Sequence, residues 1–416
     1  MKMVGSRSLN SFVSFKKAVA IMVSCTLFLS ACGTTGGGPM VGPAISSELD
    51  EKKVTVTQTT RPGLDVIIPV FDPGLPAEED YAEEGIWPEL RRAEASHFAL
   101  MLKDELEKTN KFGAVRVTPN KHATGDIYIM GVIDESDGES VEISLELYDI
   151  SGERWFSKSF DHTVNEQFHN NYRNKGKDAY RPVFKEAAAY IVEQLEDYSA
   201  KEIESLKNLT AVRFGANFSE ETFAQYLETD GDSVTLIGMP SKDDPMLVRT
   251  KAIRVRDELF IDQMQLQYEA FDEKMRESYG VWQKESQLEV KAASDARMKS
   301  IGQAVVGALA IGLAIAAASS NSNNNYSFGK DVAAVMAGIG GGVLLSESFK
   351  TSEEARFHRE ALEELGKSID IELAPQVVEF EKKTVELTGN ANQQFSQWRE
   401  FLKEIYREEA IPDKQL

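Results

Sequence analysis

A long uncharged stretch between two charged helical segments constrains the fold of this chain more than any other feature. No charged residue occurs over 300–329, and Ile301–Ala318 is a run of 18 residues that are all apolar or small except for one glutamine. An asparagine-rich polar segment follows at 319–327, after which Val332–Leu345 is apolar again. The pattern predicts two apolar helices joined by a short loop, a hairpin over residues 301–346.

Both apolar runs carry a small residue at every fourth position. These are Ala304, Ala308, Gly312 and Ala316 in the first run, and Ala334, Gly338, Gly342 and Ser346 in the second. Such spacing lines small side chains along one helix face, so that two backbones can approach closely, as they do in membrane helices. The two runs resemble the glycine-zipper segments of some outer-membrane lipoproteins, although glycine recurs less regularly here.

The length of the runs leaves three interpretations of the hairpin open. A helix needs about 20 apolar residues to span a bilayer; the first run is close to that length and the second is shorter. The small-residue spacing favours insertion into a membrane. A buried or oligomeric apolar core and a disordered spacer are the alternatives.

The N-terminal segment has the layout of a secretory signal. Its basic residues (Lys2, Arg7, Lys16 and Lys17) precede the apolar run Ala18–Leu29. The run ends in the tetrapeptide Leu-Ser-Ala-Cys, which consists of Leu29, Ser30, Ala31 and Cys32. This tetrapeptide resembles the lipobox of bacterial lipoproteins. An ordinary signal peptide with a chance cysteine is the alternative.

The lipobox resemblance implies cleavage before Cys32, so that residues 1–31 are the signal peptide, and acylation of Cys32, with palmitate among the chains. A multiply acylated cysteine anchors a protein firmly to a membrane. Gly33, and not aspartate, follows the cysteine. In the lipoprotein family this implies the outer membrane, with the body of the protein facing the periplasm.

Composition limits the partners of the chain. Its 46 basic and 67 acidic residues give a formal net charge of −21, and the four basic residues of the signal bring the mature chain to about 42 − 67 = −25. Such a charge repels phosphate backbones, so nucleic acid is not an expected partner. The two cysteines are Cys25, inside the signal, and Cys32. No thiol is therefore left for a disulfide or a metal site.

Residues 32–53 read as a flexible tether rich in Gly, Pro, Ser and Thr, and 54–208 as one α/β domain. The elements expected in this domain are a buried strand at Leu64–Phe71, a helix at Pro88–Asn110, a strand at Ala114–Thr118, a meander at Ile127–Asp134, Val141–Ile150 and Trp155–Val164, and a long helix from Tyr180 to about Asn208. Gly138 and Gly152 stand where the meander needs tight turns.

This order of elements resembles the small α/β domain of TolB N-terminal, CsgG-like and PelC-like envelope lipoproteins. In that group the domain is a scaffold or ring-forming module, which is what the resemblance implies here. It transfers no site residue to this chain.

The remainder is predicted to be mostly helical, giving an α+β class: a small domain with helices packed on a mostly antiparallel sheet, followed by a long antiparallel helical stalk. The segments are a linker at 209–248, a first stalk arm at 249–300, the hairpin, and a second arm at 347–416. The first arm carries an aromatic and methionine stripe that predicts helix–helix core. The second arm is interrupted near Pro375.

No pattern in the sequence indicates catalysis. The five histidines lack metal-ligand spacing, and no phosphate loop, nucleophile elbow or His-Glu-x-x-His motif occurs. Acidic clusters such as residues 134–139 fit solvated loops better than a cation site. We therefore expect no catalytic residue, no metal and no cofactor.

The sequence predicts a non-enzymatic outer-membrane lipoprotein that is an oligomeric scaffold or a component of an envelope export or secretion assembly. Its expected partners are the membrane, copies of itself and other envelope proteins. In a sharper form of this hypothesis, hairpins packed through Gly312 and Gly338 hold a ring together. The alternative is a periplasmic module that binds a polymer or peptide through Tyr148 and Trp155 on the meander, with the hairpin as a spacer.

Overall fold

The computed structural model describes residues 63–77, 81, 86–318, 353–367, 370–380 and 383–409, without the side chains of 293–318, 353–356, 380 and 409. All the described residues belong to one compact unit. The lipobox, the tether and the second small-residue run, Ala334–Ser346, lie outside the described residues. The domain boundaries set out above stay predictions.

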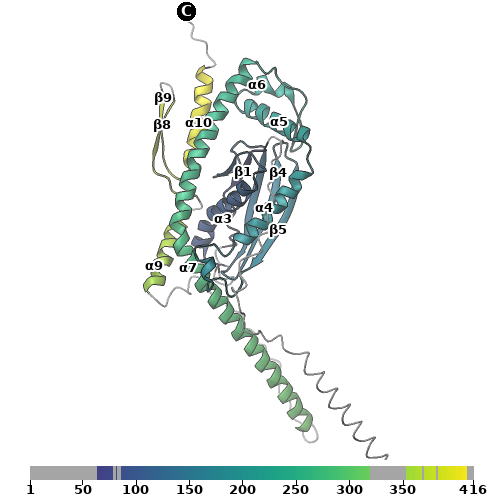
Figure 1. Cartoon of the computed structure of the whole chain (residues 1–416), viewed down its shortest axis with the longest axis vertical. Helices are drawn as coiled ribbons and strands as arrows, with labels where there is room; N and C mark the ends of the chain where they lie inside the picture. Colours follow the sequence, from purple (N-terminus) through teal and green to yellow (C-terminus); the bar gives the residue numbers. More distant parts are fainter. Residues whose placement is uncertain are drawn as a thin grey trace, which may run out of the picture. The chain divides into compact units, whose positions relative to one another are not determined.

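A five-stranded mixed sheet is the centre of the α/β part (Figure 1). Its strands are β1 (Val66–Pro69), β2 (Val115–Thr118), β3 (Ile127–Ser136), β4 (Ser140–Asp149) and β5 (Arg154–Thr163), in the order β2-β1-β3-β4-β5. β1 runs parallel to β2 and to β3, whereas β3, β4 and β5 form the expected antiparallel meander. The turns of the meander place Gly138 and Gly152 at φ +92°, a conformation that favours glycine.

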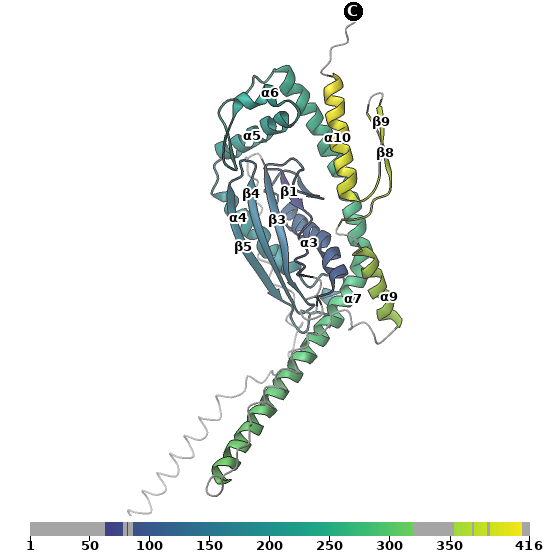
Figure 2. The same ribbon diagram turned by 180° about the vertical axis from the view of Figure 1, so that it is seen from behind.

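Two helices pack on one face of this sheet. α3 (Pro88–Thr109) and α4 (Arg181–Glu196) meet through Phe98 and Phe184, whose ring centroids lie 5.1 Å apart. On β4 every second side chain is buried beneath these helices, and the residues between them are half-buried, as the alternation predicts. Figure 2 shows α3 and α4 behind the strands. The α+β class is confirmed.

The predicted single helix from Tyr180 to Asn208 is wrong, because a second helix begins within it. α4 ends at Glu196, and α5 (Ala200–Phe218) starts with a capping box. The Ser199 hydroxyl accepts from the backbone N–H of Glu202 at 3.3 Å, and the Glu202 carboxylate accepts from the backbone N–H of Ser199 at 2.7 Å. This reciprocal pair satisfies donors that a new helix leaves free, so the chain turns here.

The linker contains α6 (Glu220–Phe223), the 3₁₀ turn η3 (Ala224–Tyr226) and a hairpin of β6 (Leu227–Asp230) and β7 (Ser233–Leu236). A small core of Val212, Phe223 and Leu247 holds this segment against α5 and the start of the next helix.

Helix α7 runs from Pro245 to Ala318, 74 residues without a break. It joins the first stalk arm to the first apolar run, so Ala304, Ala308, Gly312 and Ala316 are all helical, as expected. Most of the stripe of the arm is buried in the same hydrophobic core as α3, which confirms its role as core, but Leu259, also expected in the stripe, is exposed. The most buried members of the stripe are Phe260, Met264, Tyr268, Met275, Tyr279 and Trp282.

The predicted second helical arm is wrong in its middle part. α9 (Glu353–Leu365) and α10 (Ala391–Glu409) are separated by a hairpin of β8 (Gln376–Phe380) and β9 (Lys383–Leu387). Pro375 disfavours a helix, and the β-branched residues that follow it (Val377, Val378, Thr384 and Val385) favour strands. Both flanking helices pack toward α7, and Trp398 of α10 stacks on Phe260 with ring centroids 4.8 Å apart.

In the part of the chain that the structure describes, no helix combines the length and the apolar character that crossing a bilayer requires.

Candidate functional site

A cavity of about 1310 Å³ lies between α3, the loop before α4 and α7, and we call it the α3–α7 groove. Its lining mixes carboxylates with basic and amide side chains, including those of Asp104, Asn171, Lys175, Asp272 and Lys284. The β5–α4 loop supplies one wall, which includes the exposed ring of Tyr172. The groove is large enough to hold a ligand, so its chemistry bears on what the body of the protein can do.

One imidazole at the base of the groove connects three parts of the fold. His97 of α3 is only 5% exposed. Its Nε2 lies 2.9 Å from Oδ2 of Asp178, in the loop before α4, and its Nδ1 is hydrogen bonded to Oδ1 of Asp272 on α7. The two aspartates are 81 and 175 positions from the histidine in sequence. The imidazole therefore fixes the mutual position of α3, the loop and α7.

The charge of His97 follows from these partners. Burial alone would lower its pKa, but the hydrogen bonds and negative charges of Asp178 and Asp272 outweigh burial and raise the pKa to about 10. Burial would raise the pKa of each aspartate, and its bond to His97 instead holds it below the usual value. A cation between two carboxylates is thus the stable state at neutral pH.

This arrangement is unsuited to proton transfer. A general base needs a pKa near the working pH and a ring nitrogen that can reach the substrate. Both nitrogens of His97 are already bonded to carboxylates, and its pKa lies well above neutrality. The contact is a buried clamp between secondary-structure elements.

A second buried carboxyl group lies one helical turn before His97. Glu94 is fully buried, and its Oε1 accepts from the hydroxyls of Tyr279 at 2.7 Å and Ser136 at 2.6 Å. Burial raises its pKa to about 7, against the opposing charge of Arg91. Its hydrogen bonds join α3 to β3 and α7. Because the group is sealed from solvent, it does not meet a substrate.

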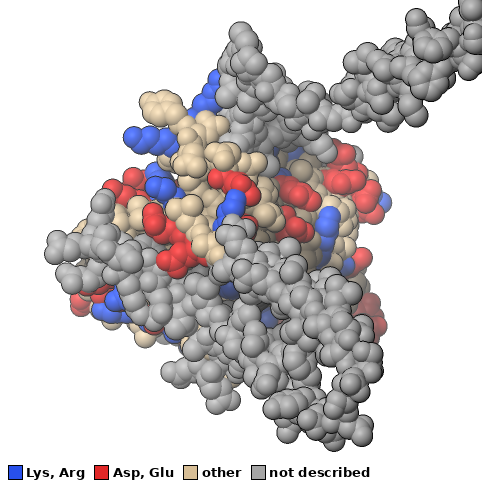
Figure 3. All heavy atoms as spheres, turned by 90° about the horizontal axis from the view of Figure 1, so that it is seen from below, with Lys and Arg blue, Asp and Glu red and all other residues tan. Residues whose placement is uncertain are grey.

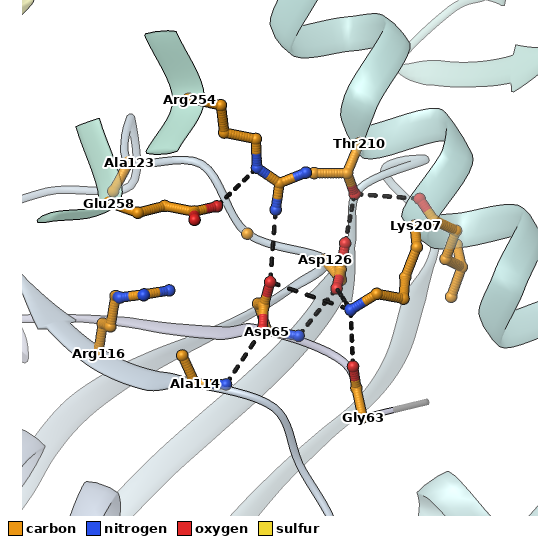
Figure 4. Close-up of polar contacts among 12 residues, drawn as sticks. Gly63, Asp65, Ala114, Arg116, Ala123, Asp126, Lys207, Thr210, Arg254 and Glu258 are labelled. Atoms are coloured by element: carbon orange, nitrogen blue, oxygen red, sulfur yellow. Dashed lines mark hydrogen bonds and ion pairs between the residues drawn. The ribbon is translucent and has the colours of Figure 1, made fainter. Parts of the chain in front are cut away.

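Aspartates lead into two of the three parallel strands and form a strand-end cluster (Figure 4). Asp65 precedes β1 and Asp126 precedes β3. One oxygen of Asp65 accepts from the backbone N–H of Ala114, which precedes β2, at 3.0 Å, and Asp126 accepts from the backbone N–H of Asp65 at 2.8 Å. The two carboxylates therefore satisfy backbone donors where the strands begin.

Side chains from two helices complete the strand-end cluster. From α5, the hydroxyl of Thr210 donates to Asp126 at 2.6 Å and the ammonium of Lys207 donates to it at 3.3 Å. From α7, Arg254 donates to Asp65 at 3.4 Å. As Figure 4 shows, these groups converge on the strand ends, so the cluster attaches both helices to the sheet.

The free edge of the sheet at β2 is closed by one glutamine of α7. Oε1 of Gln265 accepts from the N–H of Val117 at 2.9 Å, and its Nε2 donates to the carbonyl of the same residue at 2.8 Å. A side-chain amide thus replaces one residue of a neighbouring strand. The guanidinium of Arg116, on β2, also forms an ion pair with the carboxylate of Asp262, on α7, through two of its nitrogens. This edge is not open to strand addition where the glutamine binds.

The residues proposed for the alternative binding role lie near each other on the meander. Trp155 donates its Nε1–H to Asp149 at 3.0 Å and stacks on Tyr198, with ring centroids 4.0 Å apart and planes at 16°. The hydroxyl of Tyr148 donates to Glu146 at 2.9 Å. A cavity of about 380 Å³ adjoins the stacked pair.

The remaining candidates are placed as follows. Asp137, in the acidic cluster 134–139, accepts from the backbone N–H groups of Glu139 and Ser140 and so supports a turn. His162 lies on β5, within the strand expected at Trp155–Val164, and His169 lies in the loop after it. Nowhere in the described part of the chain do three His, Cys, Asp or Glu residues gather as a metal site would require.

On the end face seen in Figure 3, acidic and basic side chains of the described residues are interspersed.

The clamp of His97 is absent from the sequence-based predictions because its three members come from distant segments. One signal was present. Asp272 falls between Tyr268 and Met275 on the face of α7 that the hydrophobic stripe predicts to be core. An acid on a buried face requires a buried cationic or hydrogen-bonding partner, and the histidine of α3 is that partner.

Comparisons with known proteins give a slight likeness. No family model matches the chain, and no curated protein matches it in sequence. A solved structure of a PelC dodecamer from Paraburkholderia phytofirmans, a point variant, aligns with 33% of this chain and 94% of its own, at 14% identity and a TM-score of 0.20. PelC is one of the proteins in the group whose element order this chain resembles. At these values the likeness carries no argument about function.

Proposed function

We propose that this protein is a non-enzymatic scaffold of the bacterial envelope, held in the outer membrane by lipid on Cys32. In this proposal it faces the periplasm and belongs to an oligomeric export or secretion assembly. The lipobox supports the anchor, and the architecture of α7 supports the scaffold.

The continuity of α7 is the observation that carries the proposal. Its first part is bonded to the body through Arg254, Gln265, Asp272 and Tyr279. The same helix continues into the uncharged run 301–318 without a break. At 1.5 Å per residue, the helix beyond residue 292 is about 39 Å long. A rigid rod that joins a bonded body to an apolar end is suited to fixing a distance within an assembly.

Alkaline-carbonate extraction tests the membrane part of this proposal. The chain is expressed with Cys32→Ala and a non-lipoprotein signal, so that lipid contributes no attachment. If the hairpin inserts, this chain stays in the membrane pellet, whereas a matched chain that also lacks residues 301–345 is released. Release of both chains would show that lipid is the only membrane attachment.

The ring hypothesis has its own test in the spacing of small residues. Replacing Gly312 and Gly342 by Leu places bulk on the expected contact face of each helix, so the assembly should become smaller. Ala310→Leu adds the same side chain on the opposite side of the first helix and is the matched control. An unchanged particle mass for the double variant contradicts hairpin packing.

The stacked pair on the meander supports the alternative of a binding module. Glu153, Asp197 and Glu202 line the cavity beside Trp155 and Tyr198. Burial and the surrounding carboxylates raise the pKa of Tyr198 to about 12. An aromatic face beside carboxylates suits a cationic polymer or peptide.

Titration with a lysine-rich peptide, followed by tryptophan fluorescence, separates the two roles. Binding that Trp155→Ala abolishes, that Trp155→Phe keeps and that deletion of 301–345 spares supports the module. Equal responses of the wild type and Trp155→Ala count against it.

A further inference from the structure

An exposed apolar stripe runs along α7 on a face different from its core face. Val248, Val255, Leu259 and Leu266 are 53%, 54%, 57% and 63% exposed, although their neighbours Phe260, Ile261 and Met264 are buried. Intervals of seven, four and seven residues bring all four to one side of the helix. Ala252 and Ala270, both exposed, lie on the same side. From Val248 to Leu266 the apolar residues follow the alternating intervals of four and three of a coiled-coil seam, interrupted at Asp262, and the stripe to Ala270 is about 33 Å long.

Apart from the ion pair of Asp262, which interrupts the stripe, the contacts that hold α7 to the rest of the body lie away from it. The α/β body meets the helix at Asp262, Gln265 and Tyr279, and α10 meets it at Phe260. The core face of α7 is therefore already packed, and the stripe residues do not take part in that packing. A stripe this regular and narrow is more specific than the scattered exposed apolar residues of an ordinary surface.

We infer that the α7 stripe, Val248 to Ala270, pairs with the same stripe of a second copy of this chain in an antiparallel coiled coil. This inference deepens the proposed scaffold function and rests on it for its role. The stripe fits itself when reversed. With the two-fold axis near Leu259, Ala252 and Val255 of one helix face Leu266 of the other, so small and medium residues meet a large one.

The charges beside the stripe favour the same orientation. Lys251 flanks its N-terminal half and is exposed. Glu269 flanks its C-terminal half on the same edge; it lies 3.9 Å from Lys103 of α3 and keeps 54% of its side chain exposed. Antiparallel helices bring these two residues together across the interface, since their positions are nearly equidistant from Leu259. A parallel pair would align lysine with lysine and glutamate with glutamate along the helices. A C₂ interface of this kind is closed and self-complementary.

A membrane surface is a poorer occupant. Charged side chains border the stripe on both edges, and Asp262 interrupts it, held aside by its ion pair with Arg116. An interfacial helix needs a wide apolar face that can be buried in the lipid. The seam of a helix pair needs only a narrow one.

Single-cysteine cross-linking tests the pairing in the full mature chain. With Cys32→Ala and a replaced signal, no native cysteine remains, because Cys25 lies in the signal. Under mild oxidation Leu259→Cys should form a covalent dimer, since this position lies at the two-fold axis. Leu288→Cys is the matched control, because it is an exposed leucine of the same helix, 55% accessible, beyond the paired segment. Equal yields from the two variants would overturn the inference.

Two further combinations fix the orientation. A mixture of Val255→Cys and Leu266→Cys chains should cross-link, and Val255→Cys alone should not. Efficient cross-linking of Val255→Cys alone would mean a parallel pair and would overturn the antiparallel arrangement. Adding Leu266→Glu to Leu259→Cys should reduce its yield to the level of the Leu288→Cys control. These results are independent of carbonate extraction. A chain that resists extraction but does not cross-link refutes only the pairing. A chain that cross-links but is released by carbonate refutes only the membrane attachment by the hairpin.

Discussion

Replacing Glu94 by glutamine tests whether a buried carboxyl between α3 and α7 sets the pH dependence of stability. Burial raises the pKa of Glu94 from 4.5 to about 7, so the folded state binds its proton more tightly than the unfolded state does. Below the lower pKa the group is neutral in both states, and its burial carries no charge penalty. As pH rises from there to about 7 the penalty grows, and above 7 it is complete at about 3 kcal/mol.

Glutamine removes this penalty and keeps the principal hydrogen bonds. Its carbonyl oxygen can accept from Tyr279 and Ser136 as Oε1 of Glu94 does. Its amide N–H groups replace Oε2, which has no hydrogen-bond partner, and this adds a cost that does not vary with pH. The difference in unfolding free energy between variant and wild type should therefore increase by about 2.5 kcal/mol from pH 5 to pH 8, whatever its starting value.

Urea unfolding followed by tryptophan fluorescence measures this difference, because Trp282 and Trp398 are both buried around α7. The unlipidated mature chain is unfolded at several values of pH in that interval. Glu193→Gln, at an exposed position of α4, is the control and should show a flat difference. A difference for Glu94→Gln that is equally flat would refute the raised pKa, and a difference that falls with pH would reverse the sign of the reasoning.

Three other changes test the remaining contacts. Asp272→Asn leaves the His97 imidazolium buried with one carboxylate and should destabilise the protein by about 3 kcal/mol near neutral pH. Because the pKa of His97 is raised, its stabilisation is complete below about 6.5 and is lost as pH rises toward about 10, so the variant should show a flatter stability profile over that interval in chemical unfolding. Gln265→Ala leaves both backbone groups of Val117 without their partner and should cost about 1–3 kcal/mol, compared by thermal unfolding with Gln263→Ala at an exposed position. Ser199→Ala removes half of the capping box and should cost about 1 kcal/mol, with faster amide hydrogen exchange confined to the first turn of α5.

The meander shows what a sequence pattern can predict. Val141, Ile143, Leu145 and Leu147 alternate with polar residues, so a strand with one buried face follows from the period of two. The turns at Gly138 and Gly152 follow from the need for positive φ. The core stripe of α7 follows from its helical period in the same way. These features are local, because each depends on residues a few positions apart.

The errors arose where local signals competed. The stretch from Tyr180 to Phe218 keeps helical propensity throughout, and only the Ser199–Glu202 capping box divides it. Pro375 predicts a break within a helix, but the segment that follows it, rich in β-branched residues, forms a hairpin. The clamp of His97 could not be found by spacing, since its three residues are brought together by tertiary packing alone.

The polar contacts of α7 determine its position on the body more strictly than its apolar contacts do. A helix that shifted by one residue along its axis would turn each side chain by about 100° and move it by about 1.5 Å. Leucine and methionine tolerate part of such a change, but the two bonds of Gln265 to Val117 and the bond of Asp272 to His97 do not. Because these contacts act at separate turns of α7, they permit one register and one rotation. The direction in which α7 presents its exposed stripe, and the distance at which it holds residues 301–318 from the sheet, are therefore set by buried polar groups, which is the property that a scaffold requires.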